Sequence, residues 1–263
     1  MRGTFDRYEP GASRLHRLDA PVKLVATLAW IIATVLLPDG SWLAFALSWL
    51  LLLAANGVAQ LGWGYTLRRS LIALPFALTA LTLVWTLPGP PLVSVQIGPW
   101  LLVMTTTGVV RFASILVRSW LAVQIAILLV ATTPFVQLLA GLRRLHLPGV
   151  LVAIIGFMYR YLSVLADETQ RLLRARASRS GAVAGQRAGG TLRWRARVAG
   201  HLAGQLFLRS YERSERVYAA MLARGYAGEW RTLPTGAPRH DWALVAMLGV
   251  AMLVVQAVGW WRR

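Results

Sequence analysis

The chain has 263 residues, of which 57% are hydrophobic and only 14% are charged, yet its formal net charge is +18. A soluble domain of this length carries about a quarter charged residues. Low charge content combined with a large basic excess is typical of an integral membrane protein with basic cytoplasmic segments. A soluble nucleic-acid-binding protein is also basic, but it contains no long uncharged apolar runs, so that class is excluded and no nucleic-acid partner is expected.

Two residue counts exclude whole classes of chemistry. The chain has no Cys, which excludes disulfides, Fe–S clusters and thiolate zinc sites. Its only lysine, Lys23, precedes Leu24, so a P-loop ending in Lys-Ser or Lys-Thr is impossible. The four histidines lie far apart in the sequence. We therefore expect neither a metal site nor a cofactor on this chain, and any ATP that drives its function is bound by another chain.

Apolar runs of nearly membrane-spanning length divide the first half of the chain. After a basic arm of about 21 residues, helices are predicted over 24–37, 42–58, 70–87 and 109–131. Turn sequences rich in Pro and Gly end the first three runs. Residues 92–107 are rich in Val and Thr and fit either a short extended segment or a re-entrant piece.

Long helices are predicted in the second half of the chain. Residues 135–147 are short and amphipathic, which is typical of a helix that lies in the membrane interface. Apolar residues at three- and four-residue spacing then predict a long helix over about 150–180. A Gly-rich linker, 181–191, separates it from a second long helix over about 193–224.

The distribution of arginines predicts the orientation. Between Arg160 and Arg231 there are 14 Arg and 5 acidic residues, so the positive-inside rule places this region in the cytoplasm. A last span with Trp at both ends is predicted over 242–261. Whether 149–166 also crosses the bilayer stays open.

The overall prediction is an all-α, multi-pass protein of the cell membrane with about five transmembrane helices. It is divided into an N-terminal membrane part (1–134), a part with long cytoplasmic or interfacial helices (135–235) and a C-terminal membrane helix (236–263).

Arg118 falls well inside the predicted span 109–131. An Arg at membrane depth is costly and usually faces protein or water. Two interpretations remain open, a polar contact with another subunit and a side chain that extends to the nearby headgroup layer.

Two short sequences place an Arg among small residues where a long helix is predicted to end. One is Arg174-Ala175-Arg176-Ala177-Ser178-Arg179-Ser180, and the other is Ala223-Arg224-Gly225. An Arg with small neighbours can enter a groove of a partner and pair there bidentately. Basic residues also stabilise a helix C-terminus by about 0.3–1 kcal/mol, which is the simpler explanation for each sequence alone. Two such ends after two long helices favour docking to a partner.

Catalytic constellations are missing from the sequence pattern. Asp167 and Glu168 are adjacent, so their side chains diverge on a helix. Glu212 and Glu215 are flanked by arginines, and intrahelical ion pairs explain these two residues better than a catalytic pair does. The sequence therefore predicts no catalytic residues.

Two long stretches, from Met158 to Arg179 and from Arg209 to Tyr226, resemble the transmembrane T component of energy-coupling-factor transporters, in its cobalt (CbiQ-type) branch. Residues 15–24 and 132–135 also match, so the resemblance covers essentially the whole chain. It implies a non-catalytic scaffold in the lipid bilayer that binds two ABC ATPase subunits and a substrate-capturing membrane subunit.

The resemblance also implies site residues. Two long coupling helices end in Ala-Arg-Gly-like motifs, each docked on one ATPase; the second is 223–225 and the first is 178–180, with Arg176 as the alternative. Cobalt is the expected ion and nickel the alternative, because another chain selects it. A permease that binds its substrate by itself and a stand-alone membrane enzyme remain the alternatives from other classes.

Overall fold

The computed structural model describes residues 8–71, 75, 79–97, 100–179, 191–228 and 242–261. The described residues fall into two compact units. One is a helical bundle that contains the chain up to Leu145 together with the C-terminal helix. The other is a pair of long helices that begins after this bundle, at His146.

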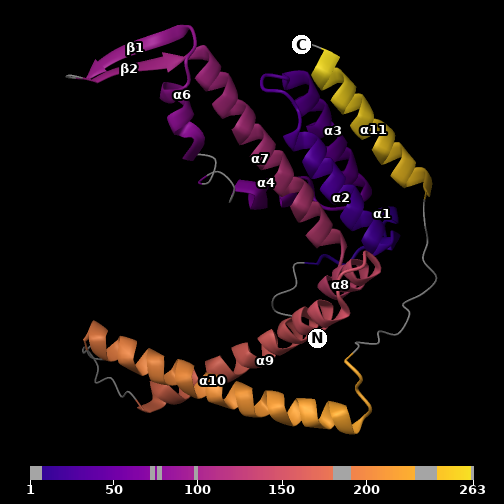
Figure 1. Ribbon diagram of the computed structural model, residues 1–263, viewed down its shortest axis with the longest axis vertical. Helices are drawn as coiled ribbons and strands as arrows, with labels where there is room; N and C mark the ends of the chain where they lie inside the picture. The colour runs from indigo at the N-terminus through magenta and orange to yellow at the C-terminus, as the bar shows by residue number, and fades with distance from the viewer. Residues whose placement is uncertain are drawn as a thin grey trace. The chain divides into compact units, whose positions relative to one another are not determined.

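Four apolar helices form the bundle, and Figure 1 shows them running alongside one another. They are α2 (Ala20–Val35), α3 (Trp42–Val58), α7 (Thr106–Thr132) and α11 (Trp242–Trp261). Helix α2 contacts both α7 and α11, and α3 contacts the same two helices. All four lie within a few residues of the predicted spans, because the apolar runs and the breakers between them were both readable.

Local signals set the ends of these helices. Pro21 lies in the first turn of α2, where a missing backbone N–H costs nothing, and Gly40 takes a positive φ of 79° in the turn that follows. The Thr105 hydroxyl accepts a hydrogen bond from the Gly108 N–H at 3.2 Å and caps the start of α7. Pro134 follows the end of α7, where it cannot continue the helix.

The inner face of α3 carries a residue every four positions that is buried in the bundle: Ala44, Ser48, Leu52 and Asn56. Small and polar side chains at such positions let helices approach closely and bond across the interface. Ser48 accepts a hydrogen bond from the Trp30 indole at 3.2 Å. Asn56 donates to Thr66 at 3.1 Å. The bundle is therefore held together by polar bonds as well as by apolar contacts.

The third predicted span, 70–87, differs from the structure. Helix α4 (Trp63–Ser70) ends where this span was expected to begin, and the described residues after it include the helical Pro75, the 3-10 turn η2 (Thr79–Thr82) and the short α6 (Leu83–Thr86). Residues 72–74 and 76–78 of this span lie outside the described residues. The 3-10 turn at Thr79–Thr82 is the described departure from one regular α-helix, and apolar composition does not indicate such a turn.

Residues 91–97 and 100–105 form two antiparallel strands, so the extended interpretation of this region was right. Strand β1 (Pro91–Ile97) pairs with β2 (Trp100–Thr105), with Ile97 opposite Trp100. The strand Pro91–Ile97 lies at the top of Figure 1 beside the start of α7. The other elements of the described chain are helical, which fits the prediction of an all-α membrane protein.

The remaining short helices extend the bundle at the other end. Helix α1 (Arg14–Arg17) precedes α2, and α8 (Phe135–Arg144) contacts α2. Gly141 of α8 lies so close to the backbone of Ala20 and Pro21 that an added Cβ would come within 3.0 Å of it. The end of α7 and the start of α2 are thus tied together through α8.

The second unit consists of α9 (Gly149–Arg179) and α10 (Leu192–Ala223), which contact each other. The two helices run antiparallel, because the start of α9 lies beside the end of α10 and the end of α9 beside the start of α10. The apolar positions predicted on α10, such as Val198 and Met221, are half-buried against α9.

Two helices of the described chain, α7 and α9, are long and apolar enough to cross a membrane by length and composition. Helices α2 and α3 and the segment 245–261 are apolar but shorter. Figure 1 shows α7 running the length of the bundle.

Candidate functional site

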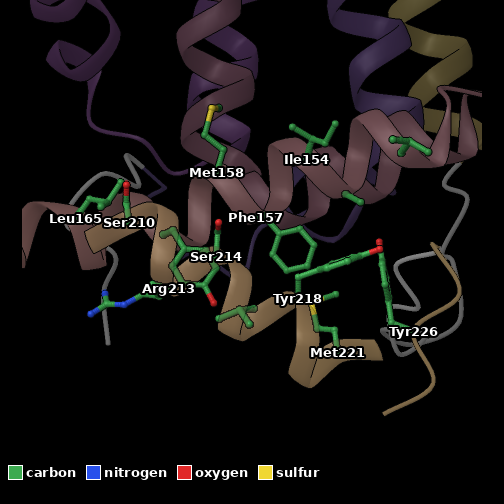
Figure 2. Close-up of a pocket in the computed structure, with 14 residues that line it drawn as sticks. Ile154, Phe157, Met158, Leu165, Ser210, Arg213, Ser214, Tyr218, Met221 and Tyr226 are labelled. Carbon is green, nitrogen blue, oxygen red and sulfur yellow. The ribbon is translucent and has the colours of Figure 1, made fainter. Parts of the chain in front are cut away.

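An apolar groove of about 410 Å³ lies between the first half of α9 and the second half of α10. Its walls are aliphatic and aromatic, and Figure 2 shows Phe157, Tyr218, Met221 and Tyr226 gathered at one end. The side chains that line it include Val150, Ala153, Ile154, Phe157, Met158, Tyr161, Leu165, Val217, Tyr218, Met221 and Tyr226. Ile154, Met158 and Tyr218 are each more than half exposed, so this apolar surface is open.

An ion pair joins the two helices beyond this groove. Arg209 of α10 donates to the carboxylate of Glu168 on α9, 41 positions away in the sequence. The Glu168 side chain is only 18% exposed, so the pair lies in a partly dry environment where the attraction is stronger than in water. This contact fixes the register of one helix against the other.

The end of α10 has the backbone geometry that the motif Ala223-Arg224-Gly225 requires. The Tyr226 N–H donates to the Met221 carbonyl and the Gly225 N–H donates to the Leu222 carbonyl, both at 3.0 Å. This is the Schellman arrangement, which needs a left-handed residue after the helix. Gly225 supplies it with a φ of 80°.

The apolar contact that usually accompanies this arrangement is also present. Tyr226 and Met221 both line the apolar groove (Figure 2). The side chain of Arg224, at the last position before the turn, is exposed and makes no hydrogen bond or ion pair with any other described residue. The motif therefore has a structural part, Gly225, and a free cationic part, Arg224.

At the end of α9 the two candidate arginines have different environments. The Arg176 guanidinium lies over the Trp194 ring, 5.7 Å from its centroid, and the side chain is half-buried. Arg179, the last residue of α9, is exposed. The Ser178 hydroxyl donates back to the Ala175 carbonyl at 2.9 Å, and Ser180 lies outside the described residues. Of the two, Arg179 has the environment that more closely matches that of Arg224.

Arg118 has a partner inside its own chain, which neither interpretation of the sequence anticipated. Its guanidinium donates to the Asp39 carboxylate at 2.8 Å and also to the Leu37 carbonyl. It lies 5.8 Å from the centroid of the Phe45 ring. An intramolecular ion pair therefore accounts for this charge at the end of the bundle, and a contact with another subunit stays a prediction.

Sequence reasoning missed the structural role of Lys23. Only 6% of the residue is exposed, and its ammonium donates to the His16 carbonyl, the Thr132 carbonyl and the Thr133 hydroxyl at 3.2–3.3 Å. Thr132 ends α7, where unpaired carbonyls and the helix dipole favour a cation. The available signal in the sequence was the position of Lys23, a charged residue directly before the apolar run 24–37.

Among the residues that the structure describes, no three His, Asp or Glu side chains come close enough together to hold a metal ion. The two acidic residues on α10, Glu212 and Glu215, lie on its exposed surface. What the second unit offers is contact surface: an apolar groove, an exposed arginine at the end of each helix and an ion pair that holds the helices together.

The described residues combine an apolar helical bundle with a pair of long helices that exposes an apolar groove and an arginine at the end of each helix. The family model described as cobalt transport protein CbiQ matches residues 11–234, and the chain belongs to this family. It is a transmembrane component of the energy-coupling-factor type, in the group of cobalt and nickel transport proteins.

Several curated proteins share this similarity. The energy-coupling factor transporter transmembrane protein EcfT of Listeria innocua is 29% identical over 84% of this chain and 84% of its own length. Cobalt transport protein CbiQ of Rhodobacter capsulatus is 30% identical over 60% of this chain and 62% of its own. Nickel permease LarQ of Lactiplantibacillus plantarum is 34% identical over 50% of this chain and 44% of its own.

Proposed function

We propose that this protein is the coupling subunit of a cobalt importer and that it transmits the motion of two ABC ATPases to a separate metal-capturing membrane subunit. The observation that carries the proposal is the end of α10, where the left-handed Gly225 turns the chain away and leaves Arg224 exposed. A guanidinium held on a fixed helix end can enter a groove of a partner and pair bidentately with a carboxylate. In this proposal Arg179 plays the same role at the end of α9.

The charge of this unit supports a cytoplasmic location. The region from Arg160 to Arg231 contains 14 Arg and 5 acidic residues, which the positive-inside rule places in the cytoplasm, where ATP is available. The chain lacks a P-loop lysine, so it depends on partners for ATP hydrolysis. The relatives include both a cobalt transport protein and a nickel permease, so nickel is the alternative ion.

The apolar groove is the proposed contact for the membrane subunit. Its lining is aliphatic and aromatic and is partly exposed, so a partner helix with an apolar face would remove it from water. We expect Ile154→Ser to reduce retention of the metal-capturing subunit in a purified complex while ATPase binding persists. Loss of both partners together would instead indicate that the helix pair has unfolded.

The ATPase contact is tested by measuring the affinity of the purified full chain for its ATPase pair. Arg224→Ala is expected to weaken binding by about 2–4 kcal/mol, as removal of a central interface Arg does. Arg216→Ala removes the same charge from the exposed surface of the same helix and is the matched control. An Arg224→Ala affinity within twofold of wild type would overturn the docking role.

A second measurement separates this function from a permease that acts alone. The purified chain without partners should show no saturable cobalt or nickel binding by calorimetry, whereas the complete complex should import the ion. Metal binding by the chain alone, together with transport in the absence of its partners, would favour the permease.

A further inference from the structure

A second groove, of about 450 Å³, lies between α9 and α10 at the opposite end of the helix pair from the apolar groove. It is bounded by the last turns of α9 and the first half of α10. Its lining contains three arginines (Arg176, Arg179 and Arg209) and no carboxylate. We call it the basic groove.

The cationic rim of the basic groove is partly held in place. The Arg176 guanidinium lies over the Trp194 ring, 5.7 Å from its centroid, which is within the range of a cation–π contact. Arg209 is anchored on the other side by Glu168. Guanidinium groups held in this way match the geometry of a phosphate, to which Arg can present two parallel N–H groups.

The floor of the same groove is apolar. Leu172 of α9 and Val198 and Leu202 of α10 line it together with the arginines and are half-buried. Free inorganic phosphate has nothing to bury against such a floor. A phosphate that carries an acyl glycerol would use both parts, with its charge at the rim and its alkyl carbons on the floor.

The residues around the groove have the pattern of a membrane-surface helix. Leu192, at the start of α10, is 85% exposed, and Trp194 is 41% exposed. Arg193 and Arg195 alternate with them. Exposed apolar and indole side chains interleaved with arginines are typical of helices that lie at the lipid headgroup layer, and basic pockets at that level hold anionic headgroups.

We propose that the basic groove binds the phosphate of an anionic phospholipid, with Arg176 and Trp194 as its principal contacts. The lipid closes the end of the helix pair and anchors it to the membrane surface. This site is separate from the apolar groove but shares Arg179 with the proposed ATPase contact. Its test therefore uses the chain without its ATPases and substitutes Arg176 and Trp194, which the proposed ATPase contact does not use.

The test is native mass spectrometry of the full chain in detergent, titrated with phosphatidylglycerol or with phosphatidylcholine. The first phosphatidylglycerol should bind about tenfold more tightly than the first phosphatidylcholine, since two guanidinium groups contribute. Arg176→Gln should reduce phosphatidylglycerol affinity about fivefold. Arg174→Gln, which removes an exposed charge two positions away and outside the groove, should stay within about twofold of wild type.

Two further measurements complete the test. Trp194→Leu keeps the apolar volume but removes the ring, and should also lower phosphatidylglycerol affinity while helicity by circular dichroism stays at the wild-type level. Glycerol 3-phosphate, which has the charge without the acyl chains, should fail to displace the bound lipid. Equal binding of the two lipids, an equal loss in Arg174→Gln and Arg176→Gln, or displacement by glycerol 3-phosphate would each overturn the proposal.

Discussion

The guanidinium of Arg118, in the middle of α7, lies 2.8 Å from a carboxylate oxygen of Asp39, in the turn between α2 and α3. The same turn is held a second time, because the Gly40 N–H donates to the Ser114 hydroxyl of α7 at 3.0 Å. The turn is thus bonded to α7 by one charged and one neutral hydrogen bond. A charge that would be costly in the membrane becomes a structural contact within the bundle.

The first prediction concerns this ion pair. Arg118→Gln should lower the free energy of unfolding by about 1–3 kcal/mol, since it removes a hydrogen bond between charged groups and leaves the Asp39 carboxylate without the partner that lies 2.8 Å away. Arg111, whose side chain is 52% exposed and lies 3.8 Å from the same carboxylate, is the matched control. Arg111→Gln should change stability by less than about 1 kcal/mol. Thermal unfolding in detergent compares the two, and equal losses would contradict the prediction.

The second prediction concerns the glycine that ends α10. Gly225→Ala should destabilise the helix end by about 1 kcal/mol, because an L side chain is strained at a φ of 80°. Gly200→Ala, in the interior of α10 with nothing within 4 Å of the added methyl, should instead stabilise the helix by about 0.5–1 kcal/mol. Thermal unfolding followed by circular dichroism measures both. Stabilisation by Gly225→Ala would show that the end of α10 can adopt another turn.

The third prediction uses the fact that Lys23 is the chain's only lysine. Its buried ammonium should react with an amine acylating reagent far more slowly in the folded protein than after denaturation, with the N-terminal amine as the internal standard. Lys23→Met keeps the aliphatic volume and removes three hydrogen bonds, so stability should fall by about 1–3 kcal/mol. Peptide mass mapping reports the acylation. Rapid native labelling would show that the bonds to Thr132 and Thr133 open readily.

The fourth prediction concerns His16, which precedes α2. Its Nε2–H donates to the Glu9 carbonyl at 3.1 Å, and its Nδ1 accepts from the Ser13 hydroxyl at 2.7 Å. Burial lowers the pKa of His16 below its ordinary value, the charge of Lys23 lowers this pKa further, and the bond to Glu9 opposes the shift.

A lowered folded pKa means that the unfolded chain takes up a proton first as the pH falls. The contribution of His16 to stability is therefore complete above about pH 6.5 and declines as the pH falls below that value. Thermal unfolding between pH 5 and pH 8 should show this dependence in the wild type and a smaller one in His16→Gln. The same slope in both proteins would assign it to other groups.

The fifth prediction separates the two arginines at the end of α9. Because Arg179 is exposed and Arg176 is stacked on Trp194, Arg179→Ala should weaken ATPase binding more than Arg176→Ala does. The expected loss for Arg179→Ala is about 2 kcal/mol or more in the affinity of the purified chain for its ATPase pair. A larger loss for Arg176→Ala would transfer the docking role to that residue.

The long apolar runs and their breakers were enough to predict α2, α3, α7, α9, α10 and α11 to within a few residues. Membrane helices are favourable for such prediction because their length and apolar composition follow from the bilayer rather than from distant contacts. The same reasoning did not predict the 3-10 turn at Thr79–Thr82 within the span 70–87, because apolar composition does not distinguish a 3-10 turn from an α-helix. The motif around Gly225 was also readable, since a Gly after a helical pattern predicts its end.

Tertiary structure decided the partners of the charged side chains. Nothing local to Arg118 indicates Asp39, and nothing local to Lys23 indicates Thr132, because these pairs are 79 and 109 positions apart. The same holds for Arg176 and Trp194, which meet because α9 and α10 run antiparallel. The sequence by itself determined which segments are helical and how their charge is distributed, because spacing and composition are local properties. Which arginines are paired and which are free depends on the packing of one helix against another.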